Sequence, residues 1–191
     1  MDTHVVAIPG SLRERSYTRL ATRRALAAAE SRGARTDPID LRELDLPVYD
    51  GDAGEAGDAG ELTRRVREAD SVLLATPVYH GSYSAPLKNA LDYCGFDEFE
   101  HTTVGLLAVA GGSFPTSALE HLRSVSRALN AWVLPHQAAL PNVSSRFEDG
   151  ELVDGTMADR VDTLGVRLVE YADIQPDPMT VEARENVGAD D

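Results

Sequence analysis

Cysteine is almost absent from this chain of 191 residues, because Cys94 is the only one. A single cysteine excludes an intrachain disulfide and the paired cysteines of thiol redox motifs and structural zinc sites. The histidines at positions 4, 101, 121 and 136 are scattered without the spacing of metal ligands, so we also expect no metal site. Any reaction chemistry must therefore come from elsewhere.

Long apolar runs are absent as well. No stretch of about 18 or more apolar residues occurs, so we expect no membrane span. The residues after Met1 lack the basic region of a secretory signal peptide, and we expect the protein in the cytoplasm. The length fits one α/β domain with a full core, which we expect over residues 1–175, followed by an acidic tail over residues 176–191.

Lysine is as scarce as cysteine, because Lys88 is the sole lysine among 18 basic residues, against 32 acidic ones and a net charge of −14. A surface that lacks lysine and is rich in Asp and Glu is typical of halophilic proteins, in whose salt-rich cytoplasm charge repulsion is screened. An acidic surface that steers a basic partner is the alternative, but the acidic residues are dispersed. We expect no nucleic-acid binding, because no basic patch is evident to replace counterions along a phosphate backbone.

The chain does contain a regular alternation of apolar runs and amphipathic segments. Apolar, β-branched runs predict strands at residues 4–9, 36–39, 71–76, 103–110 and 131–135. Helical spacing predicts helices at residues 17–32, 61–69, 117–129 and 157–171, and another through Leu87, Ala90, Leu91 and Tyr93. This alternation predicts a doubly wound α/β fold, in which helices cover both faces of a parallel sheet.

Several connections have their own signals. Gly33 is placed to end the first helix. An irregular connection at residues 40–47 is expected to turn Leu41, Leu44 and Leu46 inward, whereas residues 51–60 are rich in Gly, Ala, Asp and Glu and are expected to form a mobile, solvated loop. Lys88 is expected to pair with Asp92 or to make a subunit contact, and Trp132 to lie in the core or at an interface.

Three polar loops are expected at the carboxyl ends of the strands, where doubly wound sheets bind ligands. The first follows residues 4–9 and carries Ser11, Arg13, Ser16 and Thr18 at the start of a helix. A helix N-terminus offers unpaired N–H groups and a partial positive charge, so this loop is suited to hold a phosphate. The alternative is that Ser11 and Ser16 are only helix caps.

Other phosphate-binding motifs do not fit this loop. Gly10 stands alone and no lysine follows, which excludes the Gly-x-Gly-x-x-Gly dinucleotide fingerprint and the lysine-containing loop of nucleotide triphosphatases. A cysteine phosphatase loop needs a thiolate at the head of the turn, and this loop has none. We therefore expect it to bind a phosphate without attacking it.

Further blocks make the pattern specific. Gly10-Ser11-Leu12-Arg13 and Ser16 are followed by Pro77-Val78-Tyr79-His80-Gly81-Ser82 and by Pro86-Leu87-Lys88-Asn89-Ala90-Leu91-Asp92. With these blocks the chain resembles the NADPH-dependent FMN reductase family of flavodoxin-like proteins, over roughly residues 4–173. The resemblance implies a flavodoxin-like sheet of five parallel strands in the order 2-1-3-4-5, and a bound FMN.

The resemblance also implies which residues hold the FMN. Its phosphate is expected at Ser11, Arg13 and Ser16, with Tyr17 and Thr18 adding contacts nearby. Its isoalloxazine ring is expected along Pro77, Val78, Tyr79 and His80, where Gly81 allows close approach of the backbone. Gly111, Gly112 and Ser113 are expected to close the pyrimidine side, although a glycine pair after a strand is also a common way to turn the chain.

The activity that the resemblance implies is oxidation of NADPH or NADH, with a hydride passing through FMN to an acceptor such as a quinone, an azo compound, free flavin or a metal oxyanion. His80 is a candidate proton donor, but water can supply the proton, so no catalytic side chain is assigned. A homodimer or homotetramer is also implied. Two alternatives stay open: an FMN-binding electron carrier of the flavodoxin type without nicotinamide oxidase activity, and a flavin-free binding or regulatory domain.

Overall fold

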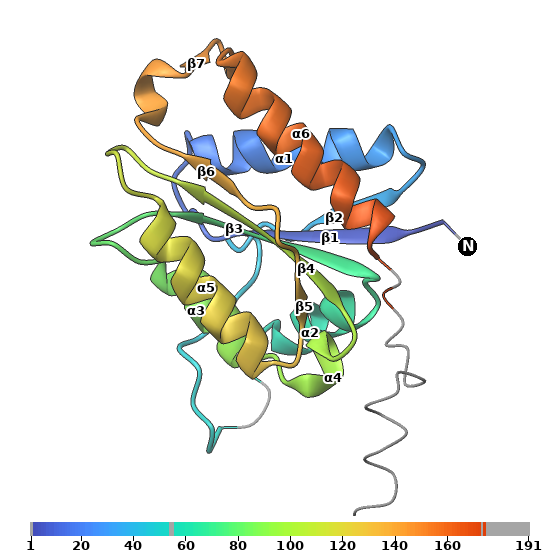
Figure 1. The fold of residues 1–191 in the computed structure, drawn as a ribbon. Coiled ribbons are helices and arrows are strands. Elements are labelled where there is room, and N and C mark those ends of the chain that lie inside the picture. The colour runs from blue at the N-terminus through green and yellow to red at the C-terminus, as the bar shows by residue number, and fades with distance from the viewer. Residues whose placement is uncertain (1, 54–55, 173, 175–191) are drawn as a thin grey trace, which may run out of the picture.

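The computed structural model describes residues 2–53, 56–172 and 174, and a parallel β-sheet forms its centre (Figure 1). The strands of this sheet are β1 (His4–Pro9), β2 (Arg35–Pro38), β3 (Ser71–Pro77), β4 (Thr103–Val109), β5 (Trp132–Val133) and β6 (Ala138–Leu140). They follow the order β2-β1-β3-β4-β5, with β6 also paired to β4, and every pairing is parallel. The predicted flavodoxin-like strand order is confirmed.

Helices cover both faces of the sheet, as predicted. They are α1 (Tyr17–Glu30), α2 (Ala59–Arg67), α3 (Ala85–Asp92), α4 (Phe96–Phe99), α5 (Thr116–Ala128) and α6 (Gly155–Glu170). Figure 1 shows α1 and α6 on one face and the other four on the opposite face. After β6 the chain forms a 3₁₀ helix, η1 (Val143–Ser145), and a hairpin of β7 (Phe147–Glu148) and β8 (Glu151–Leu152).

The two cores arise from the central strands, which are buried along their whole length. Successive side chains of a strand point to opposite faces of the sheet. Val5 and Ala7 therefore pack in the core beneath α1 and α6, whereas Val6 and Ile8 pack in the core beneath α2, α3 and α5. Burial on both sides explains why β1, β3 and β4 are continuous apolar runs rather than alternating ones.

The predicted fifth strand at residues 131–135 is wrong in its extent, because the structure divides that edge into two short strands. β5 pairs with the amino half of β4, through Trp132 opposite Thr103, and β6 pairs with its carboxyl half. Val104 of β4 pairs with Val133, and Leu107 of β4 pairs with Ala138. Two residues of β4 lie between these pairs, whereas four residues lie between them on the edge segment. The extra residues surround Pro135, which has no N–H to donate to a ladder. The sheet consequently has six strands instead of five.

The other connections are mostly as expected. Gly33 follows α1 with a φ of 85°, and its N–H donates to the carbonyl of Glu30, so it ends the helix as predicted. Leu41 is buried, and Leu44 and Leu46 pack against the core. In the loop at 51–60, residues 54–55 lie outside the described residues. The end of that loop is held in place, because Asp58 accepts from the N–H of Asp45 at 2.7 Å. The tail expected at residues 176–191 lies outside the described residues as well.

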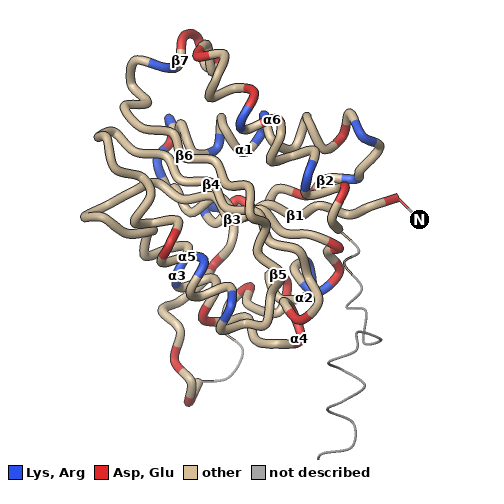
Figure 2. Tube along the Cα trace, in the orientation of Figure 1, with Lys and Arg blue, Asp and Glu red and all other residues tan. Residues whose placement is uncertain are grey.

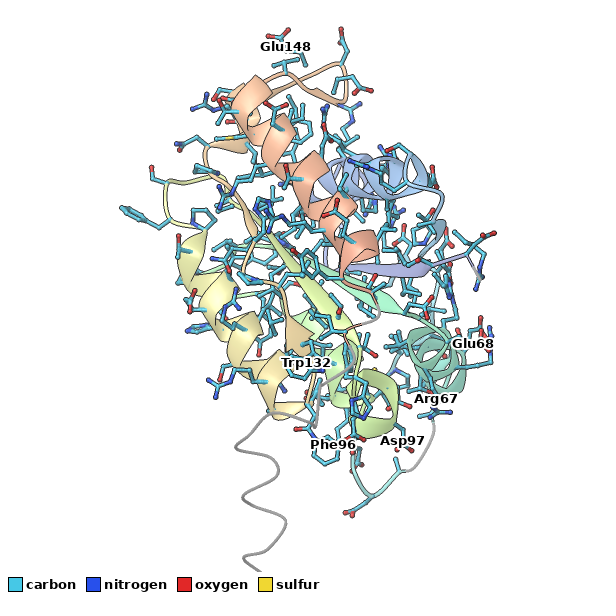
Figure 3. All side chains as sticks on the ribbon, turned by 45° about the vertical axis from the view of Figure 1, so that its right-hand side comes forward. Arg67, Glu68, Phe96, Asp97, Trp132 and Glu148 are labelled. Carbon is cyan, nitrogen blue, oxygen red and sulfur yellow. The ribbon has the colours of Figure 1, made fainter. Side chains whose placement is uncertain are left out.

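Lys88 and Trp132 were each expected to have a particular environment. Lys88 forms an ion pair with Asp92 one turn along α3, which confirms the pairing expectation. Trp132 is 42% exposed and pairs with the first residue of β4 at the amino edge of the sheet, and Figure 3 shows it at the opposite end of the molecule from Glu148 of the hairpin. No helix in the described part of the chain has the length and apolar character to span a membrane.

Candidate functional site

The first loop joins β1 to α1 and is closely packed. Ser11, Ser16 and Thr18 are buried, with 2%, 6% and 2% of their surfaces exposed. Ser16 is the N-cap of α1, because its hydroxyl accepts a hydrogen bond from the N–H of Arg19 at 3.2 Å. The capping interpretation of Ser16 is therefore correct. This hydrogen bond leaves the hydroxyl hydrogen of Ser16 available for a second partner, since a serine hydroxyl can accept and donate at once.

The backbone N–H groups of this loop are unpaired. Between residues 11 and 18, none of them donates to an acceptor in the described part of the chain. A helix N-terminus leaves such donors free, and with the helix dipole they form an anion-binding site. The loop thus has the donors that a phosphate group requires.

Arg19 of α1 holds this loop from within the protein, a role that was not predicted from the sequence. Its guanidinium donates to the carbonyl of Ser11 at 2.8 Å, to that of Arg13 at 2.5 Å and to that of Glu14 at 2.6 Å. Only 9% of its surface is exposed, and burial lowers the pKa of the guanidinium from its ordinary value. An arginine among the polar positions of an amphipathic helix is normally solvated, so its position alone did not single it out.

The second loop contains a tight turn after β3. The N–H of Tyr79 donates to the carbonyl of Ser82 at 3.0 Å and the reverse bond is 3.1 Å, while His80 and Gly81 have φ values of 50° and 78°. Positive φ at both central residues defines a type I′ turn, which favours glycine. The turn is tied to α5, since Ser82 Oγ lies 2.9 Å from His121 Nδ1. Gly81 is thus required by the turn itself.

A buried hydrogen-bond network joins the first and second loops. Ser84 Oγ donates to the carbonyl of Gly10 at 2.6 Å, and the N–H of Ser84 donates to Thr76 Oγ1 at 3.0 Å. The loops are so close at this point that a Cβ on Gly10 would lie 2.5 Å from Ser84 Oγ and 2.7 Å from Leu87 Cβ. Gly10 is needed for this close approach, and the two loops keep a fixed relative position.

The third loop follows β4 and is held by the segment after β6. The N–H of Asn142 donates to the carbonyl of Gly112 at 3.0 Å, and the N–H of Val143 donates to that of Ala110 at 3.1 Å. A Cβ at Gly111 or Gly112 would meet nothing within 4 Å. The glycine pair therefore leaves open space at the end of β4 and does not relieve a steric clash within the chain.

These loops surround a pocket of about 350 Å³, a size that suits a small organic ligand. Its lining comprises residues 11, 13 and 15–18 of the first loop, residues 77–79 of the second, Val109 and Gly111 at the third, and Val143 and Ser144 of η1. The pocket thus brings together most of the predicted residues. His80, Gly81, Gly112 and Ser113 lie on the loops but do not line it. Arg15, Val109, Val143 and Ser144 were missed, and the last two follow a strand that the sequence did not predict.

The charge at the pocket is opposite to that of the whole chain. Arg13 and Arg15 line it, and no acidic residue is among the described lining residues. Residues 13–24 contain five arginines and one glutamate, in a chain whose net charge is −14. Figure 2 shows basic positions on α1, whereas other basic and acidic positions are scattered over the remaining elements. This local charge favours an anionic ligand.

The pocket lining contains no cysteine, histidine or carboxylate among the described residues. Burial raises the pKa of Cys94 to about 12, so its thiol stays protonated at neutral pH, and Cys94 does not line the pocket. Within residues 2–53, 56–172 and 174, no group of three His, Cys, Asp or Glu side chains is arranged to hold a metal.

Comparisons with known proteins agree with this geometry. A family model of NADPH-dependent FMN reductases matches residues 3–145. The FMN-dependent NADPH-azoreductase of Staphylococcus saprophyticus is 33% identical over 152 residues, which cover 75% of this chain and 80% of that protein. The apo structure of an NADH:FMN oxidoreductase superposes with a TM-score of 0.71 at 25% identity, covering 86% of this chain and 89% of that one. An NAD(P)H:acceptor oxidoreductase of Paracoccus denitrificans has the same fold, with a TM-score of 0.76 at 21% identity over 89% of this chain and 97% of that one.

Proposed function

This chain belongs to the NADPH-dependent FMN reductase family, and from that premise we propose that its pocket holds FMN for the oxidation of NADPH or NADH. The observation that carries the proposal is the row of unpaired N–H groups at residues 11–18, beside Arg13 and at one end of a pocket of about 350 Å³. Such a row matches the doubly charged phosphate of FMN, and the pocket beyond it has room for a flat organic ring.

Each loop has its own task in this proposal. Ser11, Arg13 and Ser16 bind the phosphate, and Tyr17 and Thr18 contribute from the first turn of α1. Residues 77–79 would lie along the isoalloxazine ring, and His80 follows them on the turn that Gly81 makes possible. Gly111 would close the pyrimidine side of the ring, with Gly112 and Ser113 next to it on the same loop. The hydrogen bonds of Ser84 support this arrangement, because they fix the distance between the first loop and the second loop.

FMN held in this pocket would supply the redox chemistry, as the hydride acceptor for the nicotinamide and the electron donor for a second substrate. The protein binds and orients the two reactants and needs no nucleophile of its own. His80 is exposed on the turn, where solvent can deliver a proton, so we assign it no obligatory proton transfer. The second substrate is a small acceptor: an azo compound, a quinone, free flavin or a metal oxyanion. The staphylococcal relative, an azoreductase by name, favours testing azo compounds first.

The test is a spectrum followed by a turnover assay. Purified protein with added FMN should show the bands of a bound flavin, and NADPH or NADH should bleach them without air. Steady-state oxidation of the nicotinamide should then depend on an added quinone or azo dye. A yellow protein that neither nicotinamide reduces would be an electron carrier of the flavodoxin type. A protein that is colourless once unbound FMN has been removed would be a flavin-free domain.

We further propose a homodimer or homotetramer in the cytoplasm of an organism with salt-rich cytoplasm, with an acidic tail at residues 176–191. The net charge of −14 supports the salt-rich setting. Exposed apolar side chains support the assembly, since Leu12 is 52% and Val48 86% exposed, and both line a groove against α3. Sedimentation equilibrium in molar and in dilute salt would give the number of chains, and a monomer in both would exclude the assembly.

A further inference from the structure

We propose that Arg19 is a positioning residue that builds the phosphate site from beneath, by holding three carbonyls of the first loop so that its N–H groups stay free for an anion. The inference rests on the proposed FMN function. Arg19 does not line the pocket itself, so any effect on the cofactor passes through the loop.

The first step of the argument is the hydrogen-bond geometry. A guanidinium is planar and presents several donors in a fixed fork, which allows one side chain to bind several acceptors at once. Here the Nη atoms of Arg19 reach the carbonyls of Ser11, Arg13 and Glu14 at 2.5–2.8 Å. Three carbonyls within four residues therefore point to one side of the loop, toward the protein interior.

The second step follows from peptide geometry. In a trans peptide unit the C=O of one residue and the N–H of the next point in opposite directions. Carbonyls that turn toward Arg19 at positions 11, 13 and 14 direct the N–H groups of Leu12, Glu14 and Arg15 away from it. These N–H groups are among those without an acceptor in the described part of the chain. The guanidinium thus does here what repeated glycines do in other phosphate loops, which is to present a set of donors on one side.

The third step concerns charge. Arg19 is 9% exposed, and the nearest carboxylate oxygen, from Asp40, lies 3.9 Å from its Nε. That carboxylate is bound more closely by Arg42, at 2.5 Å. Among the described residues, the positive charge under the loop is therefore only partly compensated. A phosphate on the outer side of the loop would supply the missing counter-charge, and in a partly buried site this attraction is weakly screened.

A purely structural role for Arg19 would affect every flavin equally, and this separates the two explanations. FMN and riboflavin share the ring and the ribityl chain and differ only in the phosphate. The ratio of the riboflavin dissociation constant to the FMN dissociation constant therefore reports what the phosphate site contributes. If Arg19 builds that site, its removal lowers this ratio. If Arg19 only stabilises the fold, both constants change together and the ratio stays the same.

The experiment titrates apoprotein with each flavin and follows the quenching of flavin fluorescence. We expect Arg19→Met to lower the ratio by at least about tenfold, the equivalent of one charge-assisted hydrogen bond, while the riboflavin constant changes by less than about threefold. The matched control is Arg23→Met, which removes the same charge one turn along α1 from an exposed side chain. It should change the ratio by less than about threefold.

Arg19→Lys decides between charge and geometry, and it serves as well if the methionine variant does not fold. A lysine keeps the charge but lacks the planar fork that reaches three carbonyls, so the ratio should stay well below that of the wild type. Wild-type protein that binds no FMN would overturn the proposed function itself. Wild-type protein that binds FMN, together with a lysine variant of unchanged ratio or a methionine variant that weakens both flavins equally, would overturn the inference about Arg19 alone.

Discussion

Arg13 of the first loop and Arg19 of α1 differ in the surroundings of their guanidinium groups. The side chain of Arg13 makes no hydrogen bond or ion pair within the described residues, and it lines the pocket. A charged donor that is exposed and unpaired at a pocket is available for a ligand, whereas the buried Arg19 is committed to the backbone. In the proposed site the two arginines would have different roles, since Arg13 would contact the phosphate and Arg19 would hold the backbone of the loop.

Replacing Arg13 by Ala should weaken FMN binding by about 1.5–3 kcal/mol, the scale of a hydrogen bond to a charged group. The free energy of unfolding should hardly change, because the side chain of Arg13 is exposed. Fluorescence titration measures the affinity and urea denaturation the stability. Arg127→Ala, an exposed arginine on α5 outside the pocket lining, is the matched control. Unchanged FMN affinity in the Arg13 variant would show that the phosphate is placed wrongly.

At the scale of elements, helices α1 and α6 approach each other closely at Gly165. A Cβ on Gly165 of α6 would lie 2.0 Å from the carbonyl oxygen of Ala25 on α1, a backbone atom that cannot move aside alone. Gly165→Ala should therefore push the helices apart and lower the free energy of unfolding by at least about 1–3 kcal/mol, despite the better helix propensity of alanine. Gly155→Ala, at the open first residue of the same helix, should cost nothing. Equal denaturation curves for the two variants would contradict this packing.

The pairing of β2 with α2 predicts how stability depends on pH. Asp37 of β2 accepts hydrogen bonds from Arg65 of α2, and this bonding lowers the pKa of its carboxyl below the ordinary 3.8. A carboxyl with a lowered folded pKa contributes stability that is present above its unfolded pKa and is lost as pH falls through the folded value. Unfolding free energy should thus decline below about pH 4. In Asp37→Asn, the unfolding free energy measured by urea denaturation should fall less between pH 7 and pH 3 than it does in the wild type. An equal fall in both proteins would show that the Asp37 carboxyl does not contribute to the pH dependence.

The elements predicted well from the sequence are those whose burial produces a recognisable pattern of apolar residues. β1, β3 and β4 are covered on both faces and are continuous apolar runs, and α1 begins at a capping serine and ends before Gly33. The divided edge at β5 and β6 left no such pattern, because each strand is only two or three residues long and Pro135 interrupts them. Val143 and Ser144 reach the pocket only through that rearranged edge. Arg19 was missed for a different reason, since its partners are carbonyls, which no sequence pattern records.

At the scale of the whole molecule, the charge is the dominant feature. Ion pairs between elements, such as Arg24 with Asp162 and Arg146 with Asp154, use part of the basic residues. The net charge is nevertheless −14, so the acidic side chains repel one another in the compact folded state. Isolated exposed pairs contribute no more than about 1 kcal/mol each, so they do not offset a chain-wide repulsion. Stability should accordingly depend on how well the solvent screens the acidic surface.

Raising potassium chloride from dilute to molar concentration should therefore increase the stability of this protein. Screening shortens the Debye length from about 30 Å to about 3 Å and weakens the repulsion more than it weakens the few ion pairs. Each 1 kcal/mol gained should raise the thermal midpoint by about 2–4 °C in a chain of this size. At pH 5 the chain is close to its isoelectric point of about 4.7, so the net charge is smaller and the gain from salt should shrink. Thermal unfolding across salt at pH 7 and pH 5 measures both effects. A midpoint that falls with salt at pH 7, or a gain that is as large at pH 5, would mean that charge repulsion does not limit the stability of the fold.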